Sequence, residues 1–395
     1  MLGRQPALGL LEAESLFGSL KIRPIGLNSA LLDVPIQDIP FSRLGGSTRA
    51  AKVLTRLPYL DWNKIEEYLV TELPKHTCCL PEGKIRLGVS AYGLQVNLRR
   101  LNATGLTLKK VVKADGRSVR VVPNKELELN TAQVLHNQLT GPTGMELLLI
   151  RDGNETVLAQ TTAVQDIDAY AARDQARPAR DARVGMLPPK LAQIIVNLAT
   201  GSTPRDPSFT ILDPFCGTGV ILQEADLMNY GIKGTDMEER MVDYSHRNLV
   251  WLSQLAHSNL HGLDPDQIMH HLSVADATNH QWNADFNAIA CETYLGRPFS
   301  AEPKPEVLDE VMNDVDTIHR KFLQNVARQT DVGFRMCIAV PAWNTTTGFK
   351  HLKVLDSLEE LGYNRVKFAH VRTRDLIYYR DKQVVGRELV TLIRK

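Results

Sequence analysis

The sequence predicts an α/β protein in which a mostly parallel sheet, closed by an antiparallel hairpin, follows an α+β region. Three observations support this prediction. From Phe209 onward, short apolar runs alternate with helical segments, a glycine-rich turn follows the first run, and the last strand-like segments have short connections. Parallel strands need long crossovers, whereas antiparallel strands can be joined by short turns. The 395 residues are too many for one small core and fit two or three domains.

The first 165 residues, approximately, form the α+β region. Apolar spacing predicts a helix over 8–16, and period-two alternation predicts a half-buried strand over 84–90. A helix over 62–73 is expected to stop near Pro74, since proline cannot donate the backbone hydrogen bond of a helix interior. The other expected elements are strands over 30–34, 117–122 and 146–150, and a helix over 129–139.

Residues 166–190 differ from their surroundings, because basic side chains and prolines gather there. We interpret the segment as a linker that leads into a helix over 190–199. Its basic residues are Arg173, Arg177, Arg180, Arg183 and Lys190. The strands expected beyond it are 209–212, 231–235, 271–274, 288–291, 335–340, 366–371, 376–380 and 388–393.

Composition excludes several classes of protein. Lys and Arg (46) almost balance Asp and Glu (45), so any polyanion-binding surface has to be local. The five cysteines show no zinc-ligand spacing and favour a reduced compartment over a disulfide framework, so we expect no metal. No apolar run approaches the roughly 18–20 residues of a membrane span. The N-terminal residues contain no signal-peptide core, so we expect a cytoplasmic protein without a membrane partner.

A glycine-rich loop follows the strand over 209–212 and ends at the start of a helix near Val220. Gly217 and Gly219 let the backbone turn tightly and approach a ligand, and free N–H groups at a helix N-terminus attract an anion. A plain strand-to-helix turn has the same pattern. Two further acids favour a nucleotide-type cofactor: Asp236 and Asp276 also end strands, where they can bind ribose hydroxyls and an adenine amino group. The alternative is that each acid caps a helix. The loop is not the G-x-G-x-x-G of NAD-binding folds.

Two segments carry a resemblance to a known family. Asp213-Pro214-Phe215-Cys216-Gly217-Thr218-Gly219 looks like the first motif of class I methyltransferases that act on amino groups of RNA. The stretch from Tyr170 to Gln193, with Arg177-Pro178-Ala179-Arg180-Asp181 and Gly185-Met186-Leu187-Pro188-Pro189-Lys190, resembles the THUMP-containing tRNA guanosine-10 N2-methyltransferases. The segments 2–6 and 43–46 also look like that family.

This resemblance implies a Rossmann-like class I methyltransferase domain over 186–395, with a seven-stranded sheet. It implies a ferredoxin-like region over 1–75, a THUMP RNA-binding domain over 76–165 and a linker over 166–185. It also implies S-adenosylmethionine as the cofactor and tRNA as the partner, and we expect a monomer. The residues expected to bind the cofactor are Met186, Leu187, Pro188, Asp213, Pro214, Phe215, Cys216, Gly217, Thr218, Gly219, Asp236, Met237, Asp276 and Ala277.

The expected catalytic motif departs from the family pattern. The family has Asp-Pro-Pro-Tyr at the end of the fourth strand, where the acid accepts hydrogen bonds from the target amine and the aromatic ring stacks on the base. The matching residues here are Glu292, Thr293, Tyr294 and Leu295. Glu292 keeps the acceptor, Tyr294 can stack one position early, and the loop without prolines is expected to be less rigid. The alternative is that Glu292 and Tyr294 only finish a strand.

RNA contacts are expected at two basic segments. Between residues 99 and 125 the only acid is Asp115, and such a cluster can pair with phosphates. A solvated face without a partner is the alternative. The residues expected to contact RNA are Arg99, Arg100, Lys109, Lys110, Lys113, Arg117, Arg120, Arg173, Arg177, Arg180 and Lys190. The leading hypothesis is methylation of guanine N2 in tRNA. The competing hypothesis is a tRNA-binding protein of the same fold that is inactive or has an altered specificity.

Overall fold

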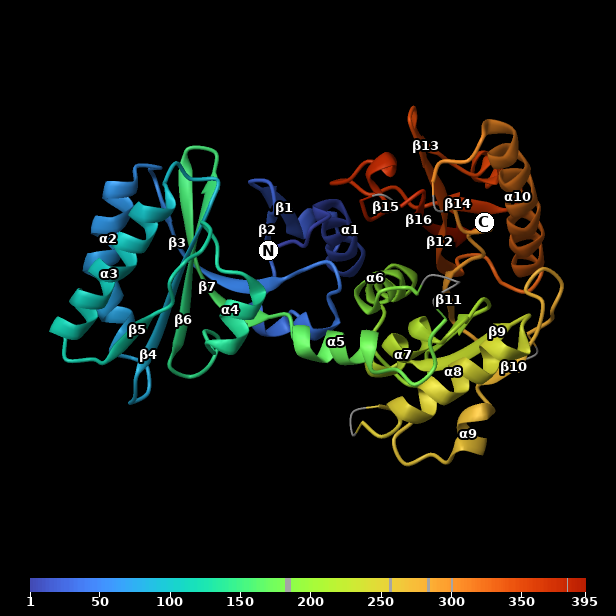
Figure 1. Ribbon diagram of the computed structural model, residues 1–395, viewed down its shortest axis with the longest axis horizontal. Helices are drawn as coiled ribbons and strands as arrows, with labels where there is room; N and C mark the ends of the chain where they lie inside the picture. The colour runs from blue at the N-terminus through green and yellow to red at the C-terminus, as the bar shows by residue number, and fades with distance from the viewer. Residues whose placement is uncertain (182–185, 256–257, 283–284, 300, 382) are drawn as a thin grey trace. The chain divides into compact units, whose positions relative to one another are not determined.

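A computed structural model describes residues 1–181, 186–255, 258–282, 285–299, 301–381 and 383–395 (Figure 1). The chain forms two compact units. The N-terminal unit contains Met1–Pro6, Leu20–Ser42 and Ser47–Ala169, and the C-terminal unit contains Ala7–Ser19, Arg43–Gly46 and Tyr170–Lys395. The expected boundary between residues 75 and 76 falls inside the N-terminal unit, and the ferredoxin-like and THUMP assignments stay predictions. The expected linker includes Arg183 and Gly185, which lie outside the described residues.

The N-terminal unit is built around a five-stranded sheet with the order β3-β7-β6-β4-β5. Two helices, α2 and α3, pack on one face of this sheet, in the left half of Figure 1. A smaller antiparallel pair, β1 and β2, belongs to the same unit. The bounds are β1 Ile22–Ile25, β2 Ser29–Leu32, β3 Arg49–Leu57, α2 Trp62–Thr77, β4 Ile85–Tyr92, α3 Leu98–Ala114, β5 Val119–Val121, α4 Thr131–His136, β6 Gly144–Asp152 and β7 Glu155–Val164.

Two helices of this unit differ from the sequence prediction. Helix α2 does not stop near Pro74, which lies in its last turn; the carbonyl of Pro74 accepts the N–H of Cys78 at 3.1 Å, so the turn closes. Helix α3 was not predicted at all; its sequence was interpreted only as a basic segment. Its buried positions Leu101, Leu108 and Val112 nevertheless follow the spacing of one helix face.

The C-terminal unit contains the mostly parallel sheet that the sequence predicted. Its main strand order is β10-β9-β8-β11-β12-β16-β14, with β13 paired to β12 and β15 paired to β16. Strands β10, β9, β8, β11 and β12 run parallel, and β16 is antiparallel to its neighbours β12 and β14. The strand bounds are β8 Thr210–Asp213, β9 Gly231–Asp236, β10 Leu272–Val274, β11 Ala288–Glu292, β12 Arg335–Thr345, β13 Gly348–Lys350, β14 Tyr363–Arg365, β15 Ile377–Tyr378 and β16 Val385–Arg394.

One expected strand, over 366–371, is wrong. The strand lies just before it, as β14, and pairs with the C-terminal end of β16 through Tyr363↔Arg394. Alternating apolar residues after β14 suggested a strand, but Phe368 and Val371 instead pack from a loop against the core. The same loop is held in place because the carboxylate of Glu14 accepts hydrogen bonds from the backbone N–H groups of Ala369 and His370.

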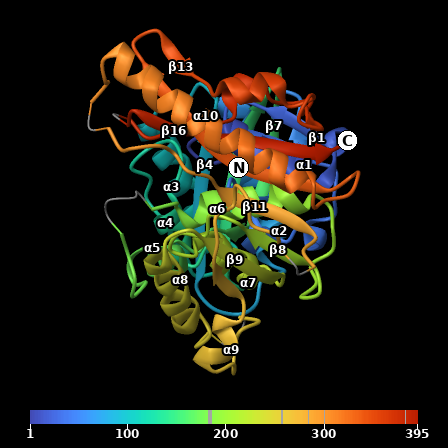
Figure 2. The same cartoon turned by 90° about the vertical axis from the view of Figure 1, so that its right-hand side faces the viewer.

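Helices cover both faces of this sheet. Helices α6, α7 and α8 bury their apolar faces on one side, and α10 packs on the other side against β11 and β12 (Figures 1 and 2). The order of the parallel strands reverses between β8 and β11, where neighbouring crossovers leave in opposite directions. Ligands of such sheets bind at the carboxyl ends of the strands flanking the reversal. The helix bounds are α1 Pro6–Phe17, α5 Ile167–Gln175, α6 Pro189–Thr200, α7 Val220–Leu227, α8 Glu239–Leu252, α9 Pro265–Met269 and α10 Pro305–Ala327.

A buried carboxylate joins the N-terminal residues of the C-terminal unit to α6. Glu12 is fully buried and accepts hydrogen bonds from the backbone N–H groups of Gly45 and Gly46, both at 2.9 Å, and from Asn197 Nδ2 at 2.7 Å. Gly46 has no room for a side chain, because a Cβ there would lie 2.5 Å from the Cα of Gly9. This contact explains why residues 7–19 and 43–46 belong to the C-terminal unit.

Replacement of Glu12 by alanine should destabilise the protein. The substitution removes the carboxylate that accepts the two glycine N–H groups, and Asn197 Nδ2 loses the same acceptor but keeps its bond to the carbonyl of Arg43. This loss costs about 3 kcal/mol or more in free energy of unfolding. Urea denaturation measures the loss. The exposed Glu310, on helix α10, is the control: Glu310→Ala should change the free energy by less than about 0.5 kcal/mol. Equal stability of the two variants would contradict this role of Glu12.

Candidate functional site

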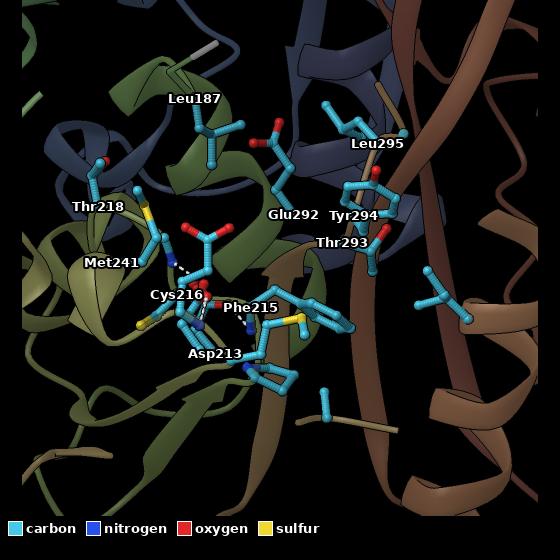
Figure 3. Close-up of a pocket in the computed structure, with 18 of the residues that line it drawn as sticks. Leu187, Asp213, Phe215, Cys216, Thr218, Met241, Glu292, Thr293, Tyr294 and Leu295 are labelled. Atoms are coloured by element: carbon cyan, nitrogen blue, oxygen red, sulfur yellow. Dashed lines mark hydrogen bonds between the residues drawn. The ribbon is translucent and has the colours of Figure 1, made fainter. Parts of the chain in front are cut away.

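A cavity of about 1090 Å³ lies at the carboxyl ends of β8 and β11, where the strand order reverses. Its walls come from the glycine-rich loop, the ends of β9 and β11, the segment before α6, and strand β16. In the view of Figure 3, the Glu292 side chain extends between Leu187 on one side and Tyr294 and Leu295 on the other. The cavity thus brings together residues that are up to 200 positions apart in the sequence.

The glycine-rich loop has the backbone conformation that its sequence predicted. Gly217 and Gly219 have φ angles of 51° and 79°, in the left-handed region that favours glycine. Gly219 precedes α7, and a Cβ there would meet Ser245 Oγ at 3.0 Å. The Ser245 hydroxyl donates to the carbonyl of Gly217 at 2.8 Å, and Asn248 Nδ2 donates to that of Thr218 at 2.8 Å. These two hydrogen bonds from α8 fix the backbone of the glycine-rich loop.

The three strand-end acids share one local structure. Each carboxylate accepts the backbone N–H two residues downstream: Asp213 from Phe215 at 3.1 Å, Asp236 from Glu238 at 3.0 Å, and Asp276 from Thr278 at 2.9 Å. Such turns are typical of aspartate. Asp236 is not a helix cap, because the N-cap residue of the following helix, α8, is Glu238. All three acids line the cavity.

Asp236 also joins two parts of the site. Its second oxygen accepts the N–H of Gly217 at 2.9 Å, so the end of β9 fixes the loop after β8. Burial raises the pKa of Asp236, while the N–H groups of Glu238 and Gly217 oppose that shift. Burial also raises the pKa of Asp213 well above its usual value, and the charges of Asp236 and Glu292 add to it. Burial thus disfavours the charged form of both carboxyl groups, which lie together in the lining of the cavity.

Most of the residues expected to bind a cofactor line this cavity. Two do not: Gly219 lies behind the loop against Ser245, and Pro188 is the N-cap residue of α6. The predicted residues that line the cavity are Met186, Leu187, Asp213, Pro214, Phe215, Cys216, Gly217, Thr218, Asp236, Met237, Asp276 and Ala277, together with Glu292 and Tyr294.

Glu292 has a partner that sequence reasoning missed. At the end of β11 its carboxylate forms an ion pair with the guanidinium of Arg387, on β16. The two side chains are 18% and 8% exposed, and both line the cavity. Burial raises the pKa of Glu292, and the charge of Arg387 opposes that shift. No sequence motif marks Arg387, since its position next to Glu292 depends on the order of strands in the sheet.

The loop after Glu292 is held firmly although it lacks prolines. Thr293 is buried, and its N–H donates to the carbonyl of Ala339 at 3.0 Å, a bond that proline cannot make. Its hydroxyl lies 2.6 Å from Nε2 of the buried His319. Nδ1 of His319 lies 2.7 Å from the carbonyl of Val315, which can only accept. Burial lowers the pKa of His319 to about 4, so the ring is neutral and its Nε2 accepts the Thr293 hydroxyl proton.

Tyr294 is suited to contact a ligand from the cavity wall. It is 47% exposed, whereas its neighbour Thr293 is buried. Gly296 follows with a φ of 83° and packs closely on Val311 and Val315 of α10, so the chain turns away directly after Leu295. Tyr294 thus exposes an aromatic ring in the wall of the cavity that Glu292 also lines (Figure 3).

The basic residues of α3 and its surroundings divide into two groups. Arg117 donates to the carbonyls of Thr77, Leu80 and Pro81 and holds the end of α2, and Arg100 pairs with Glu66. The others are exposed or half-exposed, namely Arg99, Lys109, Lys110, Lys113 and Arg120. Residues 99, 110 and 113 are spaced to share one face of the helix.

Most basic residues of the segment before α6 contact other side chains of the protein. Arg173 is 14% exposed and pairs with the buried Glu224 at 2.7 Å, while Arg177 is fully buried and lies 3.5 Å from Asp174. The ammonium group of Lys190 lies 4.9 Å from the ring centre of Tyr170, and burial lowers its pKa. Arg180 alone among these four is exposed. The basic pattern suggested a phosphate track, but most of these charges face acids and an aromatic ring.

Two negative findings apply to the described part of the chain. It contains no helix that is both long enough and apolar enough to cross a membrane. It also contains no group of three or more His, Cys, Asp and Glu side chains arranged to hold a metal ion.

Loss of the Thr293 hydroxyl should destabilise the C-terminal unit. Thr293→Val keeps the shape but leaves Nε2 of buried His319 without a donor, at a cost of about 1–3 kcal/mol in free energy of unfolding. Thr317→Val, at an exposed position of α10, is the matched control and should cost less than about 0.5 kcal/mol. Both are measured by urea denaturation. If both variants lost the same stability, the hydroxyl–imidazole bond would not hold this loop.

Two curated proteins are similar in sequence to part of this chain. A tRNA (guanine(10)-N2)-dimethyltransferase of Methanothermobacter thermautotrophicus is 31% identical over 157 residues, which cover 40% of this chain and 39% of that protein. A protein of the same name from Pyrococcus abyssi is 43% identical over 63 residues, covering 16% of this chain and 17% of that protein. The chain therefore aligns with about two fifths of the first relative's length and less than a fifth of the second's.

A solved structure and a family model were also matched. The crystal structure of TrmN from Thermus thermophilus is 17% identical, with a TM-score of 0.48 over 99% of this chain and 97% of that chain. The family of RMKL-like methyltransferase domains matches residues 177–294, a range that contains the glycine-rich loop, all three strand-end acids and Glu292-Thr293-Tyr294. This match supports the expected methyltransferase domain over the matched residues.

Proposed function

We propose that this protein is an S-adenosylmethionine-dependent tRNA methyltransferase that transfers a methyl group to N2 of a guanosine, of the position-10 type. The observation that carries the proposal is one cavity lined by both the Asp213–Gly219 loop and Glu292 with Tyr294. The loop supplies a cofactor site, and the second pair supplies an acceptor and an aromatic ring for a purine. The named activity of the two curated relatives supports guanine N2 as the target.

The residues present fit this cofactor. A cavity of about 1090 Å³ has room for a nucleoside and a base, since ligand sites usually measure roughly 300–1,000 Å³. Asp236 would bind the ribose hydroxyls, and Asp276 the adenine amino group. The loop around Gly217, with Met186 and Leu187 opposite, would hold the methionine part. When bound, the cofactor supplies an electrophilic methyl group on sulfur.

Because the cofactor supplies the reactive methyl group, the protein has only to orient the target amine toward it. The lone pair of guanine N2 is delocalised into the ring, and an acceptor for the amino hydrogens redirects it toward the methyl group. Glu292 is that acceptor in our proposal, and Tyr294 stacks on the base. Positioning of nucleophile and methyl group then provides most of the rate enhancement. A base within a helical stem has to be flipped out first, at a cost of a few kcal/mol.

The RNA-binding surface that we propose is the exposed basic face of α3. It contains Arg99, Lys110 and Lys113, with Lys109 and Arg120 nearby. Binding through phosphates should weaken steeply with salt. We retain the THUMP assignment for residues 76–165, and a cytoplasmic monomer, as parts of the same proposal.

The deciding experiment is mass spectrometry of nucleosides from total tRNA after incubation with enzyme and labelled cofactor. We expect labelled N2-methylguanosine or N2,N2-dimethylguanosine. A labelled nucleoside of another kind would reject guanine N2 as the target but would still show that the protein is a methyltransferase.

The second candidate is a tRNA-binding protein that does not transfer methyl groups. The observation in its favour is the ion pair with Arg387, which engages one oxygen of the Glu292 carboxylate. Single-turnover assays with excess enzyme discriminate between the two. Binding of tRNA without incorporation of label would favour this candidate, whereas stoichiometric incorporation would reject it.

Asp236→Ala should weaken cofactor binding. Loss of hydrogen bonds from the ribose to a charged carboxylate costs about 1.5–3 kcal/mol, which raises Kd roughly 10- to 100-fold. Isothermal titration calorimetry measures this. Glu238→Ala is the control, because Glu238 lines the same cavity but is largely exposed, and its carboxylate lies 3.5 Å from the exposed Arg240. An unchanged Kd for Asp236→Ala would contradict the cofactor assignment.

Glu292→Gln should separate binding from transfer. The variant keeps the size of the side chain, so its Kd for the cofactor should stay within about twofold of wild type. It loses the charged acceptor, and the single-turnover rate on tRNA should fall by roughly 100-fold or more. A wild-type rate in this variant would show that the amine is held by another group.

A further inference from the structure

Glu292 occupies a position where the family resemblance leads one to expect aspartate, and its partner Arg387 lies two strands away. Strand β11 pairs with β12 through Glu292↔Ala339, and β12 pairs with β16 through Pro341↔Arg387. Paired residues, and residues two apart on one strand, project to the same face of a sheet. Glu292 and Arg387 therefore share a face, on either side of β12.

The distance between these strands explains the choice of side chains. Neighbouring strands lie about 4.8 Å apart, so β11 and β16 are separated by roughly 10 Å. Only two long side chains can meet over that span, and only if the strand between them carries a small residue, as β12 does at Ala339. Aspartate is one methylene shorter than glutamate and would fall short of the guanidinium. The extra methylene of Glu292 and the presence of Arg387 are thus parts of one arrangement.

The ion pair leaves half of the carboxylate available. Nε of Arg387 donates to Oε1 of Glu292. No residue in the described ranges donates to Oε2, and this atom is absent from the buried polar atoms that lack a partner. Because Glu292 also lines the cavity, its second oxygen can be reached by a ligand.

We propose that Arg387 is the positioning residue of this site: it holds the Glu292 carboxylate ionised and oriented, with one oxygen directed to the amino group of the target base. This inference rests on the proposed function for the identity of the base. Arg387 itself needs no contact with the substrate. It acts through Glu292, and its role is separate from that of the cofactor-binding acids.

The surroundings of Glu292 make such a partner necessary. Asp213 at the end of β8 is buried, which raises its pKa and favours its neutral form, and the buried thiol of Cys291 is the adjacent residue on β11. From α10, His319 is neutral and occupied by Thr293, and Lys321 lines the cavity, as do Arg297, Tyr294 and, farther off, Asp236. The cation paired with Glu292 is Arg387. Burial would otherwise favour the protonated acid, which accepts hydrogen bonds poorly.

The first test measures Glu292 directly, without cofactor or tRNA. Carbon-13 NMR of side-chain-labelled glutamate follows the titration, and the Glu292 signal is assigned by its loss in Glu292→Gln. An opposite charge at this range lowers a carboxyl pKa by about 1–3 units. In Arg387→Met the titration midpoint should therefore move up by about one pH unit or more, and Arg387→Lys should restore much of the shift. An unmoved midpoint in Arg387→Met overturns the proposal.

Arg365→Met is the matched control. Arg365 pairs with Glu388 at 2.7 Å, and Glu388 follows Arg387 on β16, so that ion pair lies on the opposite face of the sheet. The control removes an ion pair of the same kind and should destabilise the protein, yet leave the Glu292 midpoint where it is in wild type. Equal movement in both variants would show a general loss of packing and would overturn the proposal.

The second test follows methyl transfer against pH. Ionised Glu292 is the active form, so the single-turnover rate falls as pH drops through its pKa. In Arg387→Met this acid limb should move to higher pH by the same interval as the NMR midpoint, with the cofactor Kd unchanged. If the acid side of the pH–rate profile stays in place while the NMR titration midpoint of Glu292 moves, ionisation of Glu292 does not control methyl transfer, and this part of the proposal is overturned. If wild type does not methylate tRNA, the proposed function fails, and the NMR result still decides whether Arg387 controls Glu292.

Discussion

The site depends on one topological constraint, the reversal of strand order between β8 and β11. Parallel strands end at the same edge of a sheet, and at the reversal their crossovers diverge and leave that edge open. Asp213 ends β8 and Glu292 ends β11, so both carboxylates face one cavity. The helices that bury the two faces of the sheet fix this geometry, and α8 holds the glycine-rich loop in place through Ser245 and Asn248.

Features that follow from local sequence could be predicted. The left-handed glycines, the three aspartates at strand ends and the strands before them each depend on a few neighbouring residues, and the structure contains them as expected. Local patterns failed where a distant contact decides. Arg173 belongs to a basic cluster in sequence, but Glu224, 51 residues away, pairs with it in a largely buried environment.

The partners of Thr293 and Glu292 also depend on distant contacts. His319 lies 26 residues from Thr293, and Arg387 lies 95 residues from Glu292. No spacing rule connects them. Each contact exists because α10 and β16 pack beside β11 and β12, and that arrangement is a property of the whole sheet. Sequence reasoning could identify Glu292 as a candidate acceptor, but the groups that set its charge and orientation require the fold.

The departure from Asp-Pro-Pro-Tyr therefore has a physical interpretation. The prolines of that motif restrict the backbone, and here the Thr293 amide and hydroxyl restrict it through Ala339 and His319. The shorter acid is replaced by a longer one that reaches a cation across β12. An aromatic ring is still exposed two residues after Glu292, at Tyr294. Backbone restraint, a counter-charge and a stacking surface are thus each supplied here by a different part of the fold, without the prolines of the family motif.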